Sequence, residues 1–296
     1  MKLTNKFNIP QTFVNVVKRP TYSKGKANLS VTQLINSPKI VALSKKFEEE
    51  LEQDVSEMVW SIFGSAVHKV LEHGQDENHL VEERLHAEVD GWRISGAIDL
   101  QIVQQDGIDI RDYKTVSAWS VMNEKIEWEQ QLNIYAWLVE TVKNVSVSSL
   151  GIVAIIRDWS RREAAGTNIY YPKAPIWEIP IKLWSLDERE EFIRSRIKSH
   201  SDCEFQLNTD DKLPDCTAEE MWERPTRYAI MKRGNVRAKS VHDNLQDAEW
   251  AIQDIKKENR EDYRIEVRPG SRIRCESFCP VSNYCQQWRD YQESKK

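Results

Sequence analysis

Hydrophobic residues recur along the chain with two periodicities, one typical of half-buried strands and one typical of helices. Residues 81–89 alternate between apolar and polar types, which predicts a strand with one buried face. Longer apolar runs predict three further strands, at 92–103, 108–114 and 147–156. Between the first two of these, Asp106-Gly107 suits the positive φ of a tight hairpin turn. The clearest amphipathic helix covers residues 124–143.

Helices are also predicted ahead of these strands. Ser30-Val31-Thr32-Gln33 has the form of a capping box, so a short helix should begin there and be interrupted by Pro38. A charged helical stretch is expected from Lys45 to Trp60, and Phe63-Gly64-Ser65 should open another helix. The order helix, three antiparallel strands, helix and strand predicts an α/β core with a mixed sheet.

The flanking segments have different patterns. We expect an extended polar leader at the N-terminus, Pro-interrupted strands between 170 and 184, and a charged helix at 186–200. A separate small α+β unit is expected from strands at 227–231, 236–241 and 263–268 and a helix at 245–257. The predicted organisation is a leader at 1–29, a core at 30–221, a small basic α+β unit at 222–270 and a cysteine-containing tail at 271–296.

Composition narrows the class of protein. With 40% hydrophobic and 30% charged residues, the 296-residue chain can bury a sizeable core. No run approaches the roughly 18 apolar residues of a membrane helix, and the first residues lead into no apolar signal segment. Five cysteines, an odd number without a secretory signal, argue against a disulfide framework. We therefore expect a cytoplasmic protein.

The charge is distributed unevenly. A net charge of −5 argues against general coating of polyanions. Residues 222–274 nevertheless carry 13 Lys and Arg against 9 Asp and Glu, so any contact with nucleic acid would be local. These basic residues form either a solvated surface or a DNA-facing flap.

The triplet Asp112-Tyr113-Lys114 is the first candidate for chemistry. Four Asp/Glu-x-Lys triplets occur in the chain, about as many as chance predicts, so the triplet alone carries no information. This one ends an apolar strand, and alternation puts Asp112 and Lys114 on the same face as Ile108 and Ile110. A carboxylate and an ammonium on the core side need either a function or each other as partners.

Asp99 lies on the strand expected to pair with the Asp112 strand. Carboxylates on adjacent strands can share a divalent cation such as Mg²⁺, which prefers oxygen ligands. A structural ion pair with Lys114 explains the same residues without a metal. Both interpretations stay open on these residues alone.

Three more polar residues share this region. His68 lies one turn into its predicted helix, and Gln131 and Tyr135 are four apart on one helix face. Each can be an ordinary polar residue when it is taken alone. Together, however, four stretches resemble motifs of the PD-(D/E)xK nuclease superfamily, in its RecB-like and Cas4-like branch. They are Gly64-Ser65-Ala66-Val67-His68, Gly96-Ala97-Ile98-Asp99, Asp112-Tyr113-Lys114-Thr115 and Gln131-Leu132-Asn133-Ile134-Tyr135.

The resemblance covers roughly residues 30–160 and the C-terminal cysteines, and it extends to RecB-like proteins encoded by bacteriophages. It implies a restriction-endonuclease-like αβββαβ core, with the small α+β unit and the cysteine cluster as additions. By their match to the family motifs, the metal ligands for Mg²⁺ or Mn²⁺ would be His68, Asp99, Asp112 and the backbone carbonyl of Tyr113. Such a cation promotes the ionisation of water and stabilises charge on phosphate oxygens.

The resemblance implies roles for the remaining motif residues as well. Lys114 would orient the attacking water and share the transition-state charge. Gln131 and Tyr135 would support the site or touch the DNA backbone. The branch often has an acidic residue on the first strand of the core. Glu82 fits the motif spacing, but alternation puts Glu83 with the apolar face, so this role stays open.

Cys275, Cys279 and Cys285 lie within one 11-residue stretch. In a reducing compartment such clustering indicates a metal or iron–sulfur site. The resemblance implies a [4Fe–4S] cluster bound by three C-terminal cysteines and one near the N-terminus, but Ser37 occupies the expected position of the latter. Cys216 is then the favoured fourth ligand, with Cys203 next. A four-thiolate zinc site and no metal at all are the alternatives.

These features predict a Mg²⁺- or Mn²⁺-dependent deoxyribonuclease that acts on DNA. An exonuclease or end-processing enzyme is preferred over a sequence-specific endonuclease, and this preference rests on the resemblance. The alternatives are a DNA-end-binding or scaffold protein that does not cleave, and a nuclease subunit that acts only with a helicase or recombination partner. The presence of Asp99, Asp112 and Lys114 together argues against a protein that does not cleave. No membrane partner is expected.

Overall fold

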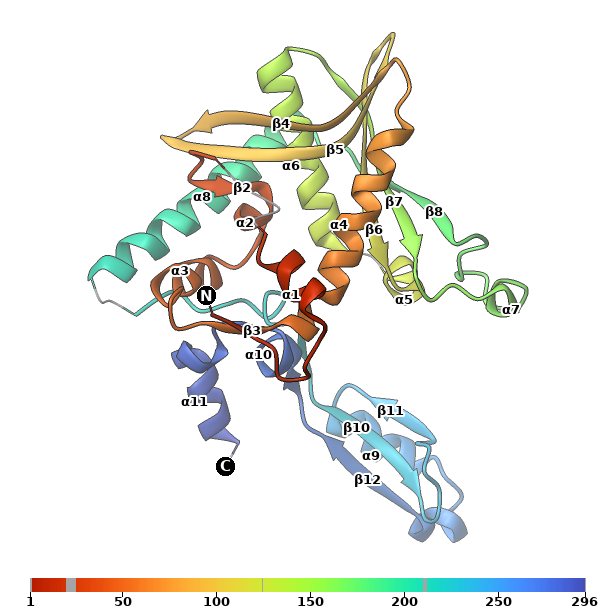
Figure 1. The fold of residues 1–296 in the computed structure, drawn as a ribbon. Helices are drawn as coiled ribbons and strands as arrows, with labels where there is room; N and C mark the ends of the chain where they lie inside the picture. The colour runs from red at the N-terminus through yellow and green to blue at the C-terminus, as the bar shows by residue number, and fades with distance from the viewer. Residues whose placement is uncertain (1, 20–24, 124, 210–211, 296) are drawn as a thin grey trace. The chain divides into compact units, whose positions relative to one another are not determined.

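The structure is a computed structural model that describes residues 2–19, 25–123, 125–209 and 212–295. The chain folds into two compact units, Met1–Leu213 and Pro214–Lys296 (Figure 1). Unit 1 contains a six-stranded mixed sheet and a short parallel pair, and unit 2 contains two small antiparallel sheets.

The central sheet of unit 1 has the strand order β2-β5-β6-β7-β8, with β4 paired to β5. The strands are β2 (Leu29–Ser30), β4 (His79–Val89), β5 (Trp92–Gln104), β6 (Gly107–Val116), β7 (Val147–Ile156) and β8 (Ile176–Ile181). The strands β4, β5 and β6 form an antiparallel meander, whereas β6 and β7 run parallel. The predicted mixed sheet is therefore confirmed, and the four predicted core strands differ from the observed ones by at most two residues at an end.

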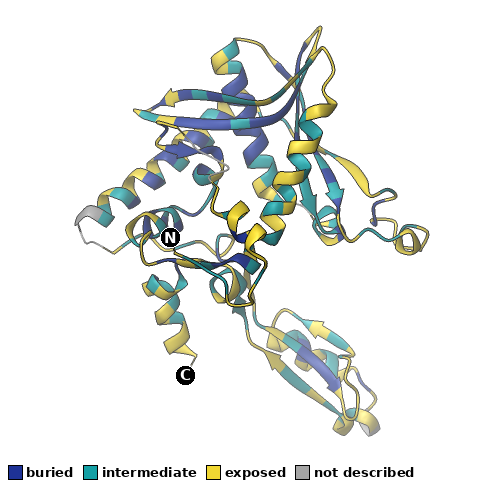
Figure 2. Cartoon of the chain, in the orientation of Figure 1, coloured by how far each residue is buried: buried dark blue, intermediate teal, exposed yellow. Residues whose placement is uncertain are grey.

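Helix α6 (Ile126–Lys143) packs against the sheet and supplies much of its core. Its side chains from Gln131 to Val139 are all buried, and the burial colours of Figure 2 show the dark blue positions on this helix and on the strands. Gly96 of β5 permits the close approach of the helix. A Cβ at this position would lie 2.8 Å from the side chains of Leu138 and Tyr135.

Three other helices complete the core of unit 1, namely α2 (Val31–Ile35), α3 (Pro38–Lys46) and α8 (Leu186–Thr209). The predicted capping box is confirmed, because the Gln33 amide donates to Ser30 Oγ (3.2 Å) and the Ser30 amide donates to Gln33 Oε1 (3.1 Å). Pro38 follows α2 as predicted, and it also opens α3 in the first helical turn. Helix α8 extends beyond the predicted residue 200, since its buried stripe continues to Cys203.

The charged stretch at 45–60 is not one helix, and the prediction for it was wrong. It contains β3 (Glu52–Asp54) and the 3-10 turn η1 (Val55–Met58), and α4 (Val59–Leu71) begins before the predicted start at Phe63. The expected extended leader was also wrong in part, because it holds β1 (Lys2–Thr4) and α1 (Gln11–Val17). The two errors are linked, since β1 pairs in parallel with β3. Asp54 accepts hydrogen bonds from the Lys6 amide (2.8 Å), Thr4 Oγ1 (2.8 Å) and the Ser56 amide (3.0 Å). These contacts hold Asp54 in an extended conformation, so no continuous helix runs through this stretch.

Unit 2 contains an antiparallel sheet in the order β11-β10-β12, with one helix beside it. Its elements are β10 (Arg227–Lys232), β11 (Ser240–His242), α9 (Leu245–Gln253) and β12 (Tyr263–Arg268). The predicted order of this α+β unit is confirmed, although β11 and α9 are shorter than predicted. A second pair, β9 (Glu223–Arg224) with β13 (Ser271–Arg272), joins the segments on either side of this sheet.

The remaining elements are short. They are η2 (Glu72–Gly74), α5 (Ala118–Met122), α7 (Arg161–Ala164), η3 (Lys257–Asp262), α10 (Ile273–Ser277), η4 (Ser282–Tyr284) and α11 (Gln286–Ser294). Within the described ranges, no helix combines the length and the apolar character needed to cross a membrane.

Candidate active site

The candidate site lies where β5 and β6 part. The paired register of the two strands runs from Gln104/Gly107 to Leu100/Arg111, and Asp99 and Asp112 come directly after that last pair. The Tyr113 amide donates instead to Asp99 Oδ2, at 2.8 Å. Both carboxylates are buried, with 8% of Asp99 and 1% of Asp112 exposed. The opening of the ladder therefore leaves two buried acidic groups next to each other at the end of the hairpin.

Lys114 and Gln131 hold the Asp112 carboxylate. Lys114 Nζ lies 2.6 Å from Asp112 Oδ2 and donates to Gln131 Oε1 at 3.1 Å. The Gln131 amide group donates to Asp112 Oδ1 (3.2 Å) and to the Tyr135 hydroxyl (2.9 Å). Because Gln131 and Tyr135 are themselves buried, they contact the site from the core side. Helix α6 thereby fixes the carboxylate and the ammonium in one arrangement.

His68 reaches the same place from α4. Its Nε2 lies 2.9 Å from the Tyr113 carbonyl oxygen, and its Nδ1 lies 3.5 Å from Asp99 Oδ1 and 3.6 Å from Glu82 Oε1. Glu82 has a φ of 49°, in the left-handed region that residues with a side chain rarely adopt. Backbone strain of this kind is concentrated at functional sites.

Glu82 and Glu83 have different surroundings. Glu83 accepts hydrogen bonds from Gln101 (2.7 Å) and from Lys143, whereas Glu82 faces His68 and Asp99. Glu82, rather than Glu83, therefore lies beside the candidate metal-binding residues. The sequence holds a signal for the position of Glu82. The tight turn at Asp90-Gly91 pairs Val89 with Trp92, and the same register continued along the two strands puts Glu82 opposite Asp99.

The electrostatics of the site follow from burial and crowding. Burial and the nearby Asp112 carboxylate raise the pKa of Asp99 to about 7, against the opposing effect of His68 and Lys114. The neighbouring Glu82 carboxylate raises the pKa of His68 to about 9, with a further contribution from Asp99. The site therefore gathers more negative charge than its own basic groups neutralise, and positive charge is favoured there.

The donor atoms of the site could hold one cation. In the part of the chain that the structure describes, His68, Glu82 and Asp99 are the one group of three whose ligating atoms all lie within 4.8 Å of one another. Asp112 Oδ2 is buried and has no hydrogen bond of good geometry, although Lys114 is close to it. Carboxylate oxygens with one imidazole are donors that suit Mg²⁺ and Mn²⁺.

The structure brings together all seven residues that the sequence singled out for the active site and the metal, namely His68, Asp99, Asp112, Tyr113, Lys114, Gln131 and Tyr135. Asp112 lies outside the compact group of three donors, and its carboxylate contacts Lys114 and Gln131 instead. Glu82 takes part in that group instead.

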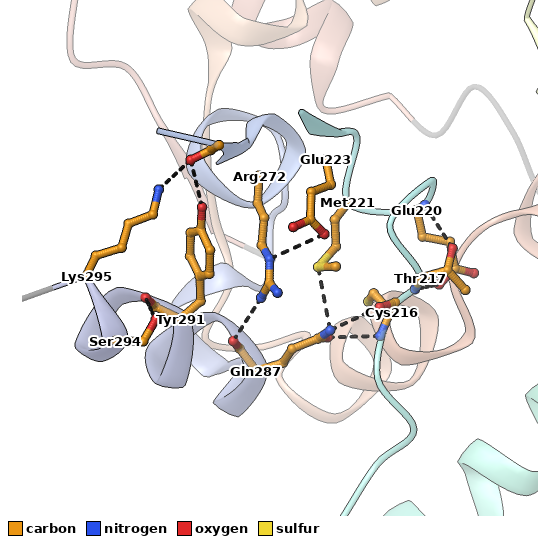
Figure 3. A network of polar contacts seen from close by, with 11 residues as sticks. Cys216, Thr217, Glu220, Met221, Glu223, Arg272, Gln287, Tyr291, Ser294 and Lys295 are labelled. Carbon is orange, nitrogen blue, oxygen red and sulfur yellow. Dashed lines mark hydrogen bonds and ion pairs between the residues drawn. The ribbon is translucent and has the colours of Figure 1, made fainter. Parts of the chain in front are cut away.

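The cysteines of unit 2 form a second cluster. Burial and the thiols of Cys279, Cys216 and Cys285 together raise the pKa of Cys275 to about 11, so the four thiols are near enough to interact. The Cys216 backbone is fixed by Gln287, whose side chain accepts from the Cys216 amide (2.9 Å) and donates to its carbonyl oxygen (3.0 Å; Figure 3). None of the five cysteines, all within the described ranges, forms a disulfide.

The other two positions considered for the cysteine site lie in unit 1. Cys203 is fully buried in α8, and Ser37, with 1% of its surface exposed, precedes α3. The interacting thiols are therefore those of Cys216 and the three C-terminal cysteines.

Two solved structures are similar to the chain over more than half of its length. One is SSO0001, with a TM-score of 0.43 and 17% identity, over 70% of this chain and 95% of that one. The other is a putative exonuclease from Eubacterium rectale, with a TM-score of 0.31 and 13% identity, over 59% of this chain and 64% of that one. Comparison with curated proteins gives no match.

The family model of the PD-(D/E)XK nuclease superfamily matches residues 75–286. The match begins after His68 and includes Asp99, Asp112 and Lys114, together with the mixed α/β fold that carries them. The chain therefore belongs to the PD-(D/E)XK nuclease superfamily.

Proposed function

We propose that the chain is a Mg²⁺- or Mn²⁺-dependent deoxyribonuclease that hydrolyses phosphodiester bonds at DNA ends, within the RecB-like and Cas4-like branch of its superfamily. The observation that carries the proposal is the meeting of Asp99, Asp112 and Lys114 where β5 and β6 part. A purely structural ion pair would account for Asp112 with Lys114. It leaves unexplained why Asp99, Glu82 and His68 gather beside them.

The residues of the candidate site have different proposed roles, which follow from their positions. His68, Glu82 and Asp99 would hold the cation, and Asp112 and the Tyr113 carbonyl are the further candidate ligands that the family motifs imply. When bound, a divalent cation promotes the ionisation of water and stabilises charge on phosphate oxygens.

Lys114 is a cationic donor of the site, and 25% of its side chain is exposed. Its ammonium can orient a water molecule or donate to a phosphate oxygen. Gln131 keeps that ammonium beside Asp112, and Tyr135 keeps Gln131 in place. We assign these two residues a positioning role, because both are buried away from any approaching DNA.

A non-cleaving DNA-end-binding protein is the rival proposal, and a subunit that needs a helicase or recombination partner is another. Purified protein with labelled single- and double-stranded DNA and Mn²⁺ separates the proposed nuclease from both rivals. The proposed function predicts cleavage that EDTA stops and that Asp112→Asn lowers by at least a hundredfold, a loss of about 2.7 kcal/mol in transition-state stabilisation. Cleavage by folded Asp112→Asn at the wild-type rate would refute the assignment. Binding without cleavage by the wild type would favour the rivals.

For the cysteine cluster we propose a [4Fe–4S] cluster with Cys216, Cys275, Cys279 and Cys285 as ligands. The two hydrogen bonds between Gln287 and the Cys216 backbone, and the electrostatic interaction of the Cys275 thiol with the other three, support one common site for these ligands. A four-thiolate zinc site is the alternative.

A further inference from the structure

Two tryptophans near the candidate site are exposed rather than buried in the core. Trp60 of α4 has 59% of its surface exposed, and Trp119 of α5 has 56% exposed. Each ring carries a cation on one face: the Arg157 guanidinium lies 4.3 Å from the Trp60 ring centroid, and Lys125 Nζ lies 4.6 Å from that of Trp119. Phe63, one turn along α4, meets the Trp60 ring edge to face at 6.5 Å.

These side chains lie near the end of the sheet at which the parallel strands β6 and β7 finish. Arg157 directly follows β7, and its amide donates to the Val116 carbonyl at the end of β6, at 3.0 Å. The next residue, Asp158, accepts from the amide of Ala118 at 2.7 Å, beside Trp119. Both rings are thus tied to the carboxyl ends of β6 and β7. Lys114 lies on the same end of β6, two residues before Val116.

Helix α4 connects these aromatic side chains to the candidate active site. Trp60, Gly64 and His68 are spaced four apart, so they follow one another along the surface of the helix. From Trp60 to His68 the helix rises about 12 Å. Gly64 leaves the surface between them bare, and a Cβ added there would meet nothing within 4 Å. The surface of α4 from Trp60 past Gly64 to His68, here called the track, therefore leads toward Asp99.

We propose that Trp60, Phe63 and Trp119, with Arg157 and Lys125, form a stacking platform that receives the unpaired bases of a single DNA strand and leads it past Gly64 into the site. Indole rings stack on nucleobases of any sequence, and neighbouring cations bind the backbone phosphates. Bases inside a duplex are already stacked on each other, so the platform selects an unpaired strand. The proposal rests on the proposed nuclease function for its location, but it can be tested by binding alone.

Exposed aromatic residues also occur in surfaces that bind proteins or lipids. Here the cation over each ring and the track to a phosphate-hydrolysing site favour nucleic acid as the occupant. Neither a protein partner nor a lipid surface would require the bare Gly64 surface that joins the platform to His68.

The first experiment measures binding without cleavage. Fluorescence anisotropy of a labelled oligothymidylate is recorded in EDTA for wild type, Trp60→Ala and Trp119→Ala, with Trp250→Ala as a matched control on α9, where the ring is 58% exposed. We expect each platform variant to bind the single strand about tenfold more weakly or worse, with blunt duplex affinity and thermal stability unchanged. Trp250→Ala should bind as the wild type does.

The second experiment blocks the track. Gly64→Ala should raise the thermal stability or leave it unchanged, because alanine is the better helix former and has space there. Gly64→Gln should fold equally well but slow cleavage of single-stranded substrate, with little effect on oligothymidylate binding at the platform.

The outcomes distinguish this inference from the proposed function. Wild-type affinity for the single strand in both Trp60→Ala and Trp119→Ala would overturn the platform, whether or not the protein cleaves DNA. Weakened binding in a protein that never cleaves would sustain the platform and refute the nuclease. Unchanged DNA binding together with loss of binding to anionic phospholipid vesicles in Trp60→Ala would overturn the platform in favour of a lipid surface.

Discussion

At the scale of single residues, the site depends on which way neighbouring side chains point. Glu82 and Glu83 are adjacent, yet one faces His68 and Asp99 and the other accepts from Gln101 and Lys143. The left-handed backbone of Glu82 accompanies this arrangement, since the ladder of β4 with β5 is continuous on both sides of it but omits the pair Glu82/Asp99. Isosteric substitutions of Glu82 and Glu83 can therefore test the role in cleavage separately from the contribution to folding stability.

We predict that Glu82→Gln lowers metal-dependent cleavage tenfold or more and weakens Mn²⁺ binding measured by calorimetry, because it removes a charged donor of the cation group. Glu83→Gln should retain cleavage per folded molecule but lose about 1 kcal/mol of unfolding free energy, since the partly exposed ion pair with Lys143 is removed. Urea denaturation with an activity assay measures both. The opposite pattern, with Glu83→Gln inactive and Glu82→Gln fully active, would contradict the assignment.

At the scale of elements, the helices α2 and α8 are joined by polar contacts at the end of α2. This helix has five residues, too few to be stable alone, and its last carbonyl groups need partners. The Leu34 carbonyl oxygen accepts from Arg196 Nε (3.1 Å) and lies 3.1 Å from His200 Nε2. Burial lowers the pKa of His200 to about 4 from an ordinary value of 6.5. A neutral His200 is therefore part of the folded arrangement.

This contact gives a pH dependence of stability. As the pH falls below 6.5, the unfolded chain protonates His200 while the folded chain does not, so stability present above pH 6.5 is lost progressively toward pH 4. We expect wild type to lose about 2 kcal/mol more unfolding free energy than His200→Gln between pH 7.5 and pH 5. Urea denaturation at both pH values measures the difference. Parallel losses in the two proteins would show that His200 titrates normally.

The same scale shows what the sequence could predict. The core strands and α6 were predicted to within two residues because their apolar periodicity is local and strong. The region 45–60 was not, since its helical composition is overridden by a pairing of β3 with β1, about fifty residues away in the chain. The site residues were found through motif order, whereas Glu82 needed the register of a hairpin. The exposure of Trp60 and Trp119 could not be predicted, because a large apolar ring within a helical pattern is expected to face the core.

At the scale of the whole molecule, the candidate sites are divided between the two units. Unit 1 holds the candidate active site, and unit 2 holds the cysteine cluster and the basic sheet. Several of the basic side chains in that sheet are paired within it, as Arg227 is with Asp243 and Arg268 with Glu266 (3.2 Å). Strands β9 and β13 pair with each other. In the chain, β9 follows Cys216 and β13 precedes Cys275.

Protein contacts alone therefore already bring Cys216 toward the three C-terminal cysteines. These contacts are the β9–β13 pairing and the hydrogen bonds of Gln287 on α11 (Figure 3). A metal cluster bound there would add to a fold that is largely formed, so its loss should loosen unit 2 rather than unfold the chain. Protein purified without oxygen should be brown. Cys216→Ser should lose the colour and the iron, and the thermal transition of unit 2 should fall while that of unit 1 stays in place.

Cys203→Ser is the matched control, because Cys203 is buried in α8 of unit 1 and should keep the full iron content whatever it does to stability. Iron and sulfide analysis with visible spectroscopy distinguishes the possibilities. If Cys216→Ser keeps its iron and Cys203→Ser loses it, the fourth ligand has been assigned to the wrong cysteine. If wild type is colourless and binds one zinc ion per chain, the four cysteines form a structural zinc site instead. Because the active-site residues all belong to unit 1 and the four thiols to unit 2, Mn²⁺-dependent cleavage by wild type would still be expected in either case.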